Sequence, residues 1–407
     1  AISVQGPLSG WAKIYGLFAQ PMIEANALLP NAGLNGTYLG DLTAQAYLDR
    51  EEKTIIIEGA AVDSMEHTVV EVQGKVIPEN KWWGLDIHCD SVDIGLIDFW
   101  THDIFTHPQG RAFGDLQVFG QERQTWVTAA IHGKDAQVTM PQLGATFYFN
   151  DSIYMDSTAI RLPDIDVRDA EGNTGVFSGI ITHQNFLNFK YDLNAQVNNM
   201  LALNLPYDPQ SLFYGKVYGS GNVHITGDDY ECKIDVNART EANSKFYLSV
   251  NTASVAANAS FVEFKAPQQT DNLLHLLSQP TQPTITALPK RTKLLLSLQL
   301  EATPTAEINI KLGGDDGIRG RGEGNLKINY DDSSEEVQML GTYTLQSGLF
   351  SYALGNIVRR NFDIAEGSRV IWSGDPLSPV VDITGRYHTT ASLRDLFGSE
   401  FSQVATN

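Results

Sequence analysis

The amino-acid sequence predicts an all-β protein: an elongated, curled sheet, antiparallel or mixed, with an open groove, a hydrophobic interior and few short helices. Two observations support this prediction. Short segments in which apolar and polar residues alternate follow one another along the chain, with the two-residue period of half-buried strands. The 407 residues also include 35 glycines and 15 tyrosines, a composition that suits strands joined by many turns.

A phrase built on two glycines recurs before several of these strands. The pairs are Gly36 and Gly40, Gly110 and Gly114, Gly215 and Gly219, and Gly320 and Gly324. Each pair leads into a strand, a polar turn and a further strand, which indicates hairpins that pair with their sequence neighbours. The glycines at 320, 322 and 324 indicate a bend or a close approach of two backbones. Residues 270–278 (TDNLLHLLS) depart from this pattern and predict a short helix capped by Asp-Asn.

The alternating apolar residues are the candidates for the lining of the groove. On a strand they point to one side, and that side is buried either against a second sheet or inside the curl of a single sheet. Periodicity does not separate these two arrangements, and an error of one residue in register would exchange the two faces. The run Val92, Ile94 and Leu96 is included and predicts a strand. The candidates are Ile55, Ile57, Leu85, Ile87, Ile94, Leu96, Leu201, Leu203, Leu205, Ile234, Val236, Phe246, Leu248, Val250, Leu294, Leu296, Leu298, Leu300, Ile308, Ile310, Leu326, Ile328, Tyr343, Leu345, Phe350 and Tyr352.

The composition excludes several classes of partner. With 48 acidic and 28 basic residues the net charge is −20, which argues against nucleic acid and against anionic lipid headgroups as the surface bound. No stretch reaches the ~20 apolar residues that a membrane-spanning helix needs. Cys89 and Cys232 lie far apart and outside any metal or redox spacing, so each is expected to pack as an unpaired apolar side chain.

The sequence indicates neither an enzyme nor a cofactor or metal site. The glycine triplet at 320–324 is followed by a strand, whereas a phosphate-binding loop needs a helix there. Asp164 and Asp166 share a strand face, but they read as exposed acids and not as a catalytic pair. The segment 101–107 (THDIFTH) has no recognised metal-ligand spacing. Aromatic residues on the strands leave carbohydrate binding as an open alternative.

The last quarter of the chain carries a resemblance. Its motif residues, in order, are Gly341, Gly348, Gly367, Trp372, Gly374, Asp375 and Pro376. In this order they resemble the C-terminal domain of the TamB subunits of the translocation and assembly module, an AsmA-like family of diderm bacteria. Within that family they would be structural markers and not a catalytic set. The resemblance is close from about Leu300, so we expect elongated groove repeats over residues 1–299 and a TamB-like region, continuous with the same groove, over residues 300–407.

The resemblance implies a β-taco-like groove in the periplasm that takes phospholipid acyl chains. It also implies a BamA-type outer-membrane barrel as partner at the C-terminal side. An anchor in the inner membrane would lie N-terminal to Ala1. Since the sequence opens on Ala1 without a methionine, we expect it to be part of a longer chain, truncated at both ends.

The function expected from these observations is conduction of phospholipids between the inner and outer membranes, in support of outer-membrane biogenesis. The alternative is an assembly factor for outer-membrane β-barrel proteins, whose free strand edge templates barrel strands together with a BamA-type barrel. A plain structural or adhesive β-solenoid is the third possibility.

Overall fold

The computed structural model describes residues 3–16, 22–34, 36–101, 104–122, 124–184, 186–208, 211, 213–249, 292–313, 316–334, 336–354, 358–376 and 378–388. The predicted helix at 270–278 and the candidate Val250 lie outside these ranges, as do His102 and Asp103 of the THDIFTH segment. Within the described ranges no helix has the length and apolar character that crossing a membrane would require.

Strands dominate the chain, and the prediction of an all-β fold is confirmed. The strands are β1 Val4–Gln5, β2 Ser9–Tyr15, β3 Met22–Leu34, β4 Thr37–Asp49, β5 Thr54–Val62, β6 Thr68–Ile77, β7 Trp82–Asp93, β8 Thr106–Gln121, β9 Gln124–Met140, β10 Ala145–Met155, β11 Ala159–Asp169, β12 Thr174–Gln184, β13 Leu187–Leu205, β14 Phe213–Asp228, β15 Glu231–Thr240, β16 Lys245–Ser249, β17 Lys293–Ala302, β18 Glu307–Gly313, β19 Asp316–Asp331, β20 Glu336–Leu354, β21 Val358–Ile364, β22 Ser368–Gly374, β23 Val380–Asp382 and β24 Gly385–Arg386. The helices among the described residues are two 3₁₀ turns, η1 Pro78–Asn80 and η2 Ile94–Ile97, and the single turn α1 Asp98–Thr101.

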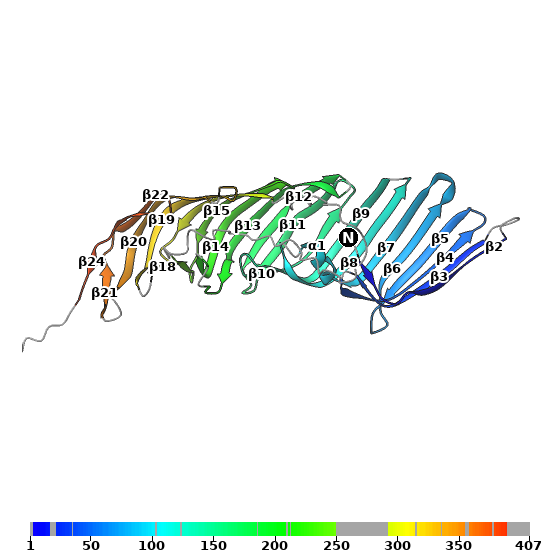
Figure 1. The fold of residues 1–407 in the computed structure, drawn as a ribbon, viewed down its shortest axis with the longest axis horizontal. Coiled ribbons are helices and arrows are strands. Elements are labelled where there is room, and N and C mark those ends of the chain that lie inside the picture. The colour runs from blue at the N-terminus through cyan, green and yellow to red at the C-terminus, as the bar shows by residue number, and fades with distance from the viewer. Residues whose placement is uncertain are drawn as a thin grey trace, which may run out of the picture.

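All 24 strands of the described part of the chain belong to one sheet, and they follow one another along the long axis of the molecule (Figure 1). From β3 to β15 each strand pairs with its sequence neighbour in antiparallel fashion. This hairpin ladder follows from alternating segments separated by short polar turns, which pair locally at little cost in loop closure.

The ladder is interrupted once by parallel pairing. β15 pairs with β17, and β16 pairs with β18, both in parallel. Beyond this junction β19 pairs with both β17 and β18 in antiparallel fashion, and β20 pairs with β21 and β22. The sheet is therefore mixed, and it stays continuous through the junction. The expected boundary between residues 299 and 300 falls inside β17.

The strands bend where their registers shift. Single-residue shifts occur in many of the paired strands, for example between Cys89 and Val92 near the C-terminal end of β7 and between Arg321 and Gly322 in the middle of β19. Such bulges bend a strand and increase its twist, so a line of them curls the sheet. Glycines of the recurring phrase lie along this line: Gly40, Gly114 and Gly215 have φ of 134°, 132° and 131°.

The glycine triplet at 320–324 belongs to the same bend. A Cβ atom on Gly322 or on Gly324 would overlap the backbone of β20 at Thr344 or Thr342. The interpretation of this triplet as a close approach of two backbones is thus confirmed. Gly324 lies directly opposite Tyr343, whose Cα atom would be 2.9 Å from a Cβ atom on the glycine.

The backbone N–H groups that the bulges leave without a ladder partner find side-chain acceptors. Asp41 accepts from the Asn31 N–H at 2.8 Å and Ser220 accepts from the Asn199 N–H at 2.8 Å. The Thr303 N–H, in the turn that follows β17, donates in the same way to the hydroxyl of Thr240 at 2.9 Å. Each such hydrogen bond contributes about 0.5–1.5 kcal/mol, so these short polar side chains stabilise the bends and the turn.

The prediction of a strand that includes Val92, Ile94 and Leu96 is wrong. β7 ends at Asp93, and the next four residues form the 3₁₀ turn η2. The Asp93 carboxylate accepts a hydrogen bond from the Gly95 N–H at 2.7 Å and so caps this turn. Ile94 is buried and Leu96 is half-buried in η2. The alternation of apolar and polar residues at 92–96 therefore does not indicate a continuous strand, because residues 94–96 lie in a capped 3₁₀ turn.

Candidate binding face

One side of the sheet carries apolar residues in rows that cross many strands; we call it the apolar face. Directly opposed residues of paired strands point to the same side. The first row crosses β5 to β9, the second crosses β9 to β13, and the third crosses β13 to β19. Their members are Ile57, Gly74, Leu85, Val118 and Val127; Ala129, Met155, Ile160, Ile181 and Tyr191; and Leu193, Ile225, Ile234, Leu296 and Tyr330.

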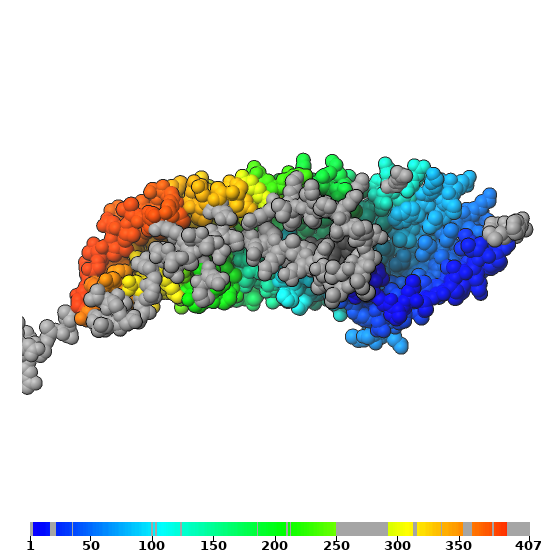
Figure 2. All heavy atoms as spheres, in the orientation of Figure 1, coloured from blue at the N-terminus to red at the C-terminus, as the bar shows by residue number. Residues whose placement is uncertain are grey.

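No charged side chain occurs in these three rows. The third row continues on the same side of the sheet through the parallel junction, since Ile234 lies opposite Leu296 in the parallel β15–β17 pair. The apolar face is therefore continuous from β5 to β19. Figure 2 shows the surface of the molecule hollowed along β5–β9, between the upper and lower ends of these strands.

The other side of the sheet is polar. One row there consists of Glu58, Gln73, Asp86, Gln117 and Thr128, and another of Asn194, His224, Asp235, Ser297 and Asn329. Cross-strand pairs on this side include His88 with Asp115, 2.8 Å apart. The hydrogen bond from His88 to Asp115 raises the pKa of the imidazole. The acidic character of the chain is thus displayed on this polar side.

The predicted candidates divide by burial. Most lie on strands and are half-buried: Ile55, Ile57, Leu85, Ile87, Leu203, Leu205, Ile234, Val236, Phe246, Leu248, Leu294, Leu296, Leu298, Leu300, Ile308, Ile310, Ile328 and Phe350. Leu201, Leu326, Tyr343 and Leu345 are buried, whereas Tyr352 is 40% exposed. Cys89 and Cys232 are free thiols, and both are half-buried, as most of the predicted candidates are.

Several members of the apolar face were absent from the prediction. They are Val72, Leu116, Val118, Val127, Ile131, Ile153, Ile160, Ile181, Leu193, Val223 and Ile225. Glycine or alanine interrupts the aliphatic alternation around them, as Gly114 and Gly120 do in β8. The signal that would have found them is the two-residue spacing counted through glycine and alanine, which an apolar face accommodates as readily as leucine.

The motif residues in the last quarter of the chain take part in packing, in hydrogen bonds or in turns of the backbone. Trp372 is buried, and its indole N–H donates to the Pro376 carbonyl oxygen at 3.1 Å. The Asp375 carboxylate accepts a hydrogen bond from the Ser378 hydroxyl at 2.8 Å. Positive φ angles of 134°, 88° and 152° are found at Gly341, Gly367 and Gly374.

Around Trp372 the apolar face forms a packed cluster, which we call the C-terminal cluster. Its buried members are Ala302, Leu326, Tyr343, Leu345, Ile364, Val370 and Trp372, with Leu300, Ile308, Ile318, Met339, Phe350 and Ile383 packed against them. Burial raises the pKa of the Tyr343 hydroxyl to about 12, so it stays neutral at any physiological pH. Gly348 lies beside the cluster, where a Cβ atom would approach Cδ1 of Ile364 to 3.1 Å.

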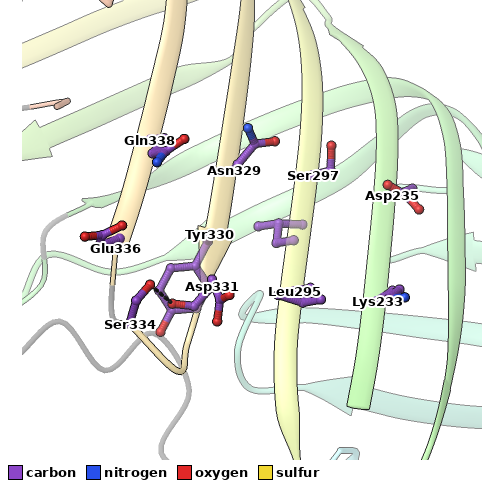
Figure 3. A pocket seen from close by; sticks show the side chains of 11 residues that line it. Lys233, Asp235, Leu295, Ser297, Asn329, Tyr330, Asp331, Ser334, Glu336 and Gln338 are labelled. Carbon is purple, nitrogen blue, oxygen red and sulfur yellow. Dashed lines mark hydrogen bonds between the residues drawn. The ribbon is translucent and has the colours of Figure 1, made fainter. Parts of the chain in front are cut away.

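A cavity of about 400 Å³ lies over β15, β17, β19 and β20 (Figure 3). Its lining combines Leu296 and Tyr330 of the third apolar row with polar residues that include Lys233, Asp235, Ser297, Asn329 and Gln338. At its lower end in the figure, the Ser334 hydroxyl donates to the Asp331 carbonyl oxygen at 3.3 Å. With its mixed charges it offers no environment for an extended apolar ligand, which leaves the apolar face as the candidate site.

Comparison with known proteins identifies one family. The family model described as the TamB C-terminal domain matches residues 164–406. The match begins well upstream of Leu300, the point from which the motif residues carried the resemblance. Neither a curated protein nor a solved structure matches the chain.

Proposed function

Because this chain belongs to the TamB family, and so to the translocation and assembly module of the bacterial envelope, we propose that its apolar face conducts phospholipids. In this proposal the protein lies in the periplasm and acyl chains pass along the sheet between the inner and outer membranes. An inner-membrane anchor on the same protein and a BamA-type barrel at the outer membrane complete the path. The function is binding and passage, without a catalytic step.

The observation that carries this proposal is the continuity of the apolar face. The first two rows meet in β9, at Val127 and Ala129, and the last two meet in β13, at Tyr191 and Leu193. An acyl chain moving from strand to strand would therefore meet no charged side chain in these rows. The polar rows on the other side face water and suit an aqueous compartment.

The energetics suit passage better than permanent capture. Burying acyl chains stabilises by about 0.8 kcal/mol per CH₂ group, which holds a lipid whose chains are mostly covered. Each step along the face exchanges contact with the apolar residues of one strand for contact with those of the next strand. The change in free energy per step is therefore small compared with the free energy of binding.

Transfer of a fluorescent phospholipid between donor and acceptor vesicles tests the proposal. Leu203→Asp or Leu296→Asp places a carboxylate on the apolar face and should lower the transfer rate at least tenfold. Gln299→Asp is the matched control, because Gln299 lies in the same strand as Leu296 and is exposed on the polar side. Equal transfer by Leu296→Asp and Gln299→Asp would contradict the proposal.

A further inference from the structure

The C-terminal cluster joins two parts of the apolar face that lie on opposite sides of the bend. One part is the row Leu300, Leu326, Gly341 and Trp372. The other is the row Ile308, Gly320, Gly348 and Ile364. The register shift between Arg321 and Gly322 separates the two rows in β19. Since members of both rows occur in the same packed cluster, the two sides of the apolar face contact each other there.

Glycines make this contact possible. A Cβ atom on Gly320 would overlap Cδ2 of Leu345, and one on Gly348 would come within 3.1 Å of Cδ1 of Ile364. The side chains of Leu345 and Ile364 therefore occupy space that any larger residue at 320 or 348 would fill. Leu345 is 2% exposed and Ile364 is 6% exposed, so neither offers surface to a ligand.

The face upstream of β17 differs in burial. Ile57, Leu85, Ile87 and Ile234 are half-buried, although their rows are as apolar as those of the cluster. The fully buried apolar residues upstream are distributed over many strands and include Leu29, Val69, Ile165, Met200 and Leu201 beside alanines such as Ala61 and Ala145. The half-buried aliphatic rows upstream thus retain apolar surface that a ligand can cover, whereas in β19–β22 the buried residues Leu326, Tyr343, Leu345, Ile364, Val370 and Trp372 pack into one cluster.

We infer that the stretch of the apolar face that takes acyl chains ends at β17, and that the C-terminal cluster closes it. This inference rests on the proposed function, and it specifies the strand at which the bound lipid stops. A phospholipid that has reached β15 or β17 leaves the sheet before β19. Further travel along the interior requires Leu345, Ile364 and Trp372 to separate, which exposes their packed apolar surface and costs the free energy of that burial.

Labelling with a phospholipid that carries a diazirine on its acyl chain tests this inference in the unaltered protein. The lipid is offered in phosphatidylcholine vesicles, and the labelled residues are located by peptide mass spectrometry after photolysis. We expect label on β5–β15, at positions such as Ile87 and Ile234, and at least tenfold less on β19–β22. The polar positions Gln117 and Asn237 report labelling from outside the apolar face.

The outcomes separate the inference from the proposed function. Absence of label on β5–β15 would overturn the proposed function itself. Label at Leu326 and Leu345 equal to that at Ile87 would leave the proposed function standing and overturn the closure. Leu345→Ala and Ile364→Ala should both extend labelling into β19–β22 if the cluster is the barrier. Ile87→Ala is the matched control and should leave the downstream boundary of labelling unchanged.

Discussion

Gly341 lies so close to Asn325 that a Cβ atom on the glycine would overlap the Asn325 carbonyl oxygen. The φ angle of Gly341 is 134°, a region that residues with side chains rarely adopt. Gly341 lies directly opposite Leu326 on one side and Trp372 on the other. The close approach of β19 to β20 and the positive φ therefore both require glycine in the middle of the C-terminal cluster.

Gly341→Ala should destabilise the protein by about 1–3 kcal/mol, because strained backbone and a backbone overlap act together. Gly367→Ala is the control: its φ is also positive, at 88°, but no atom lies within 4 Å of the added methyl group. Urea unfolding followed by circular dichroism measures both variants. An equal loss in the two would show that the approach to Asn325 contributes nothing.

Asp169 ties the β11–β12 turn to the bend of β13. Its carboxylate accepts from the N–H groups of Glu171 and Asn173 at 2.9 Å each and from the Leu201 N–H at 2.8 Å. Asp169→Asn replaces one acceptor oxygen by a donor, so we expect a loss of about 1–3 kcal/mol at neutral pH. Asp166→Asn, on the same strand but exposed, should change stability little.

The effect of Asp169→Asn should depend on pH. Burial acts to raise the pKa of Asp169, but hydrogen bonds from Asn173 and Leu201 outweigh it and hold the pKa below its usual value. A lowered pKa in the folded state stabilises above the unfolded pKa of about 3.9, and that contribution is lost as pH falls through the folded value. The difference between the wild type and the variant should therefore narrow between pH 5 and pH 2. A difference that is constant over this range would contradict the assignment.

Trp372 anchors the C-terminal cluster through both packing and a hydrogen bond. Trp372→Ala should cost about 3–5 kcal/mol, because it leaves a cavity among Leu326, Tyr343 and Val370. Trp372→Phe should cost less, since it keeps most of the packing and loses the hydrogen bond to Pro376. Trp11→Ala, at a tryptophan that is 48% exposed on β2, is the control and should cost least.

Much of the sheet could be predicted from the alternation of apolar and polar residues. The two-residue period predicts that Ile234 and Val236 share one side of their strand and that Leu296 and Leu298 share one side of theirs. In the structure Ile234 lies opposite Leu296, and Val236 lies opposite Leu298. Alternation is informative here because the two faces of each strand meet different surroundings, one half-buried and one exposed to water. Local pairing then extends the pattern from strand to strand.

The features that alternation could not predict depend mainly on contacts between residues that are remote in sequence. The parallel pairing of β15 with β17 depends on where the chain returns after β16, and no local pattern encodes it. The turn at Ile94 depends on a single cap from Asp93, which reads as an ordinary polar residue of a strand. The burial of Leu345 in β20 depends on the room that Gly320 leaves in β19, and Ile364 in β21 packs in the same way against Gly348 of β20, a property of three strands together.

Native mass spectrometry of the protein purified from an envelope extract tests whether the apolar face binds phospholipid. We expect phospholipid bound to the wild type and to Asn237→Asp, an exposed polar-side residue of β15, and at least tenfold less bound to Ile234→Asp, in the same strand on the apolar face. A wild type that carries no phospholipid, or an Ile234→Asp variant that binds as much as Asn237→Asp, would contradict it.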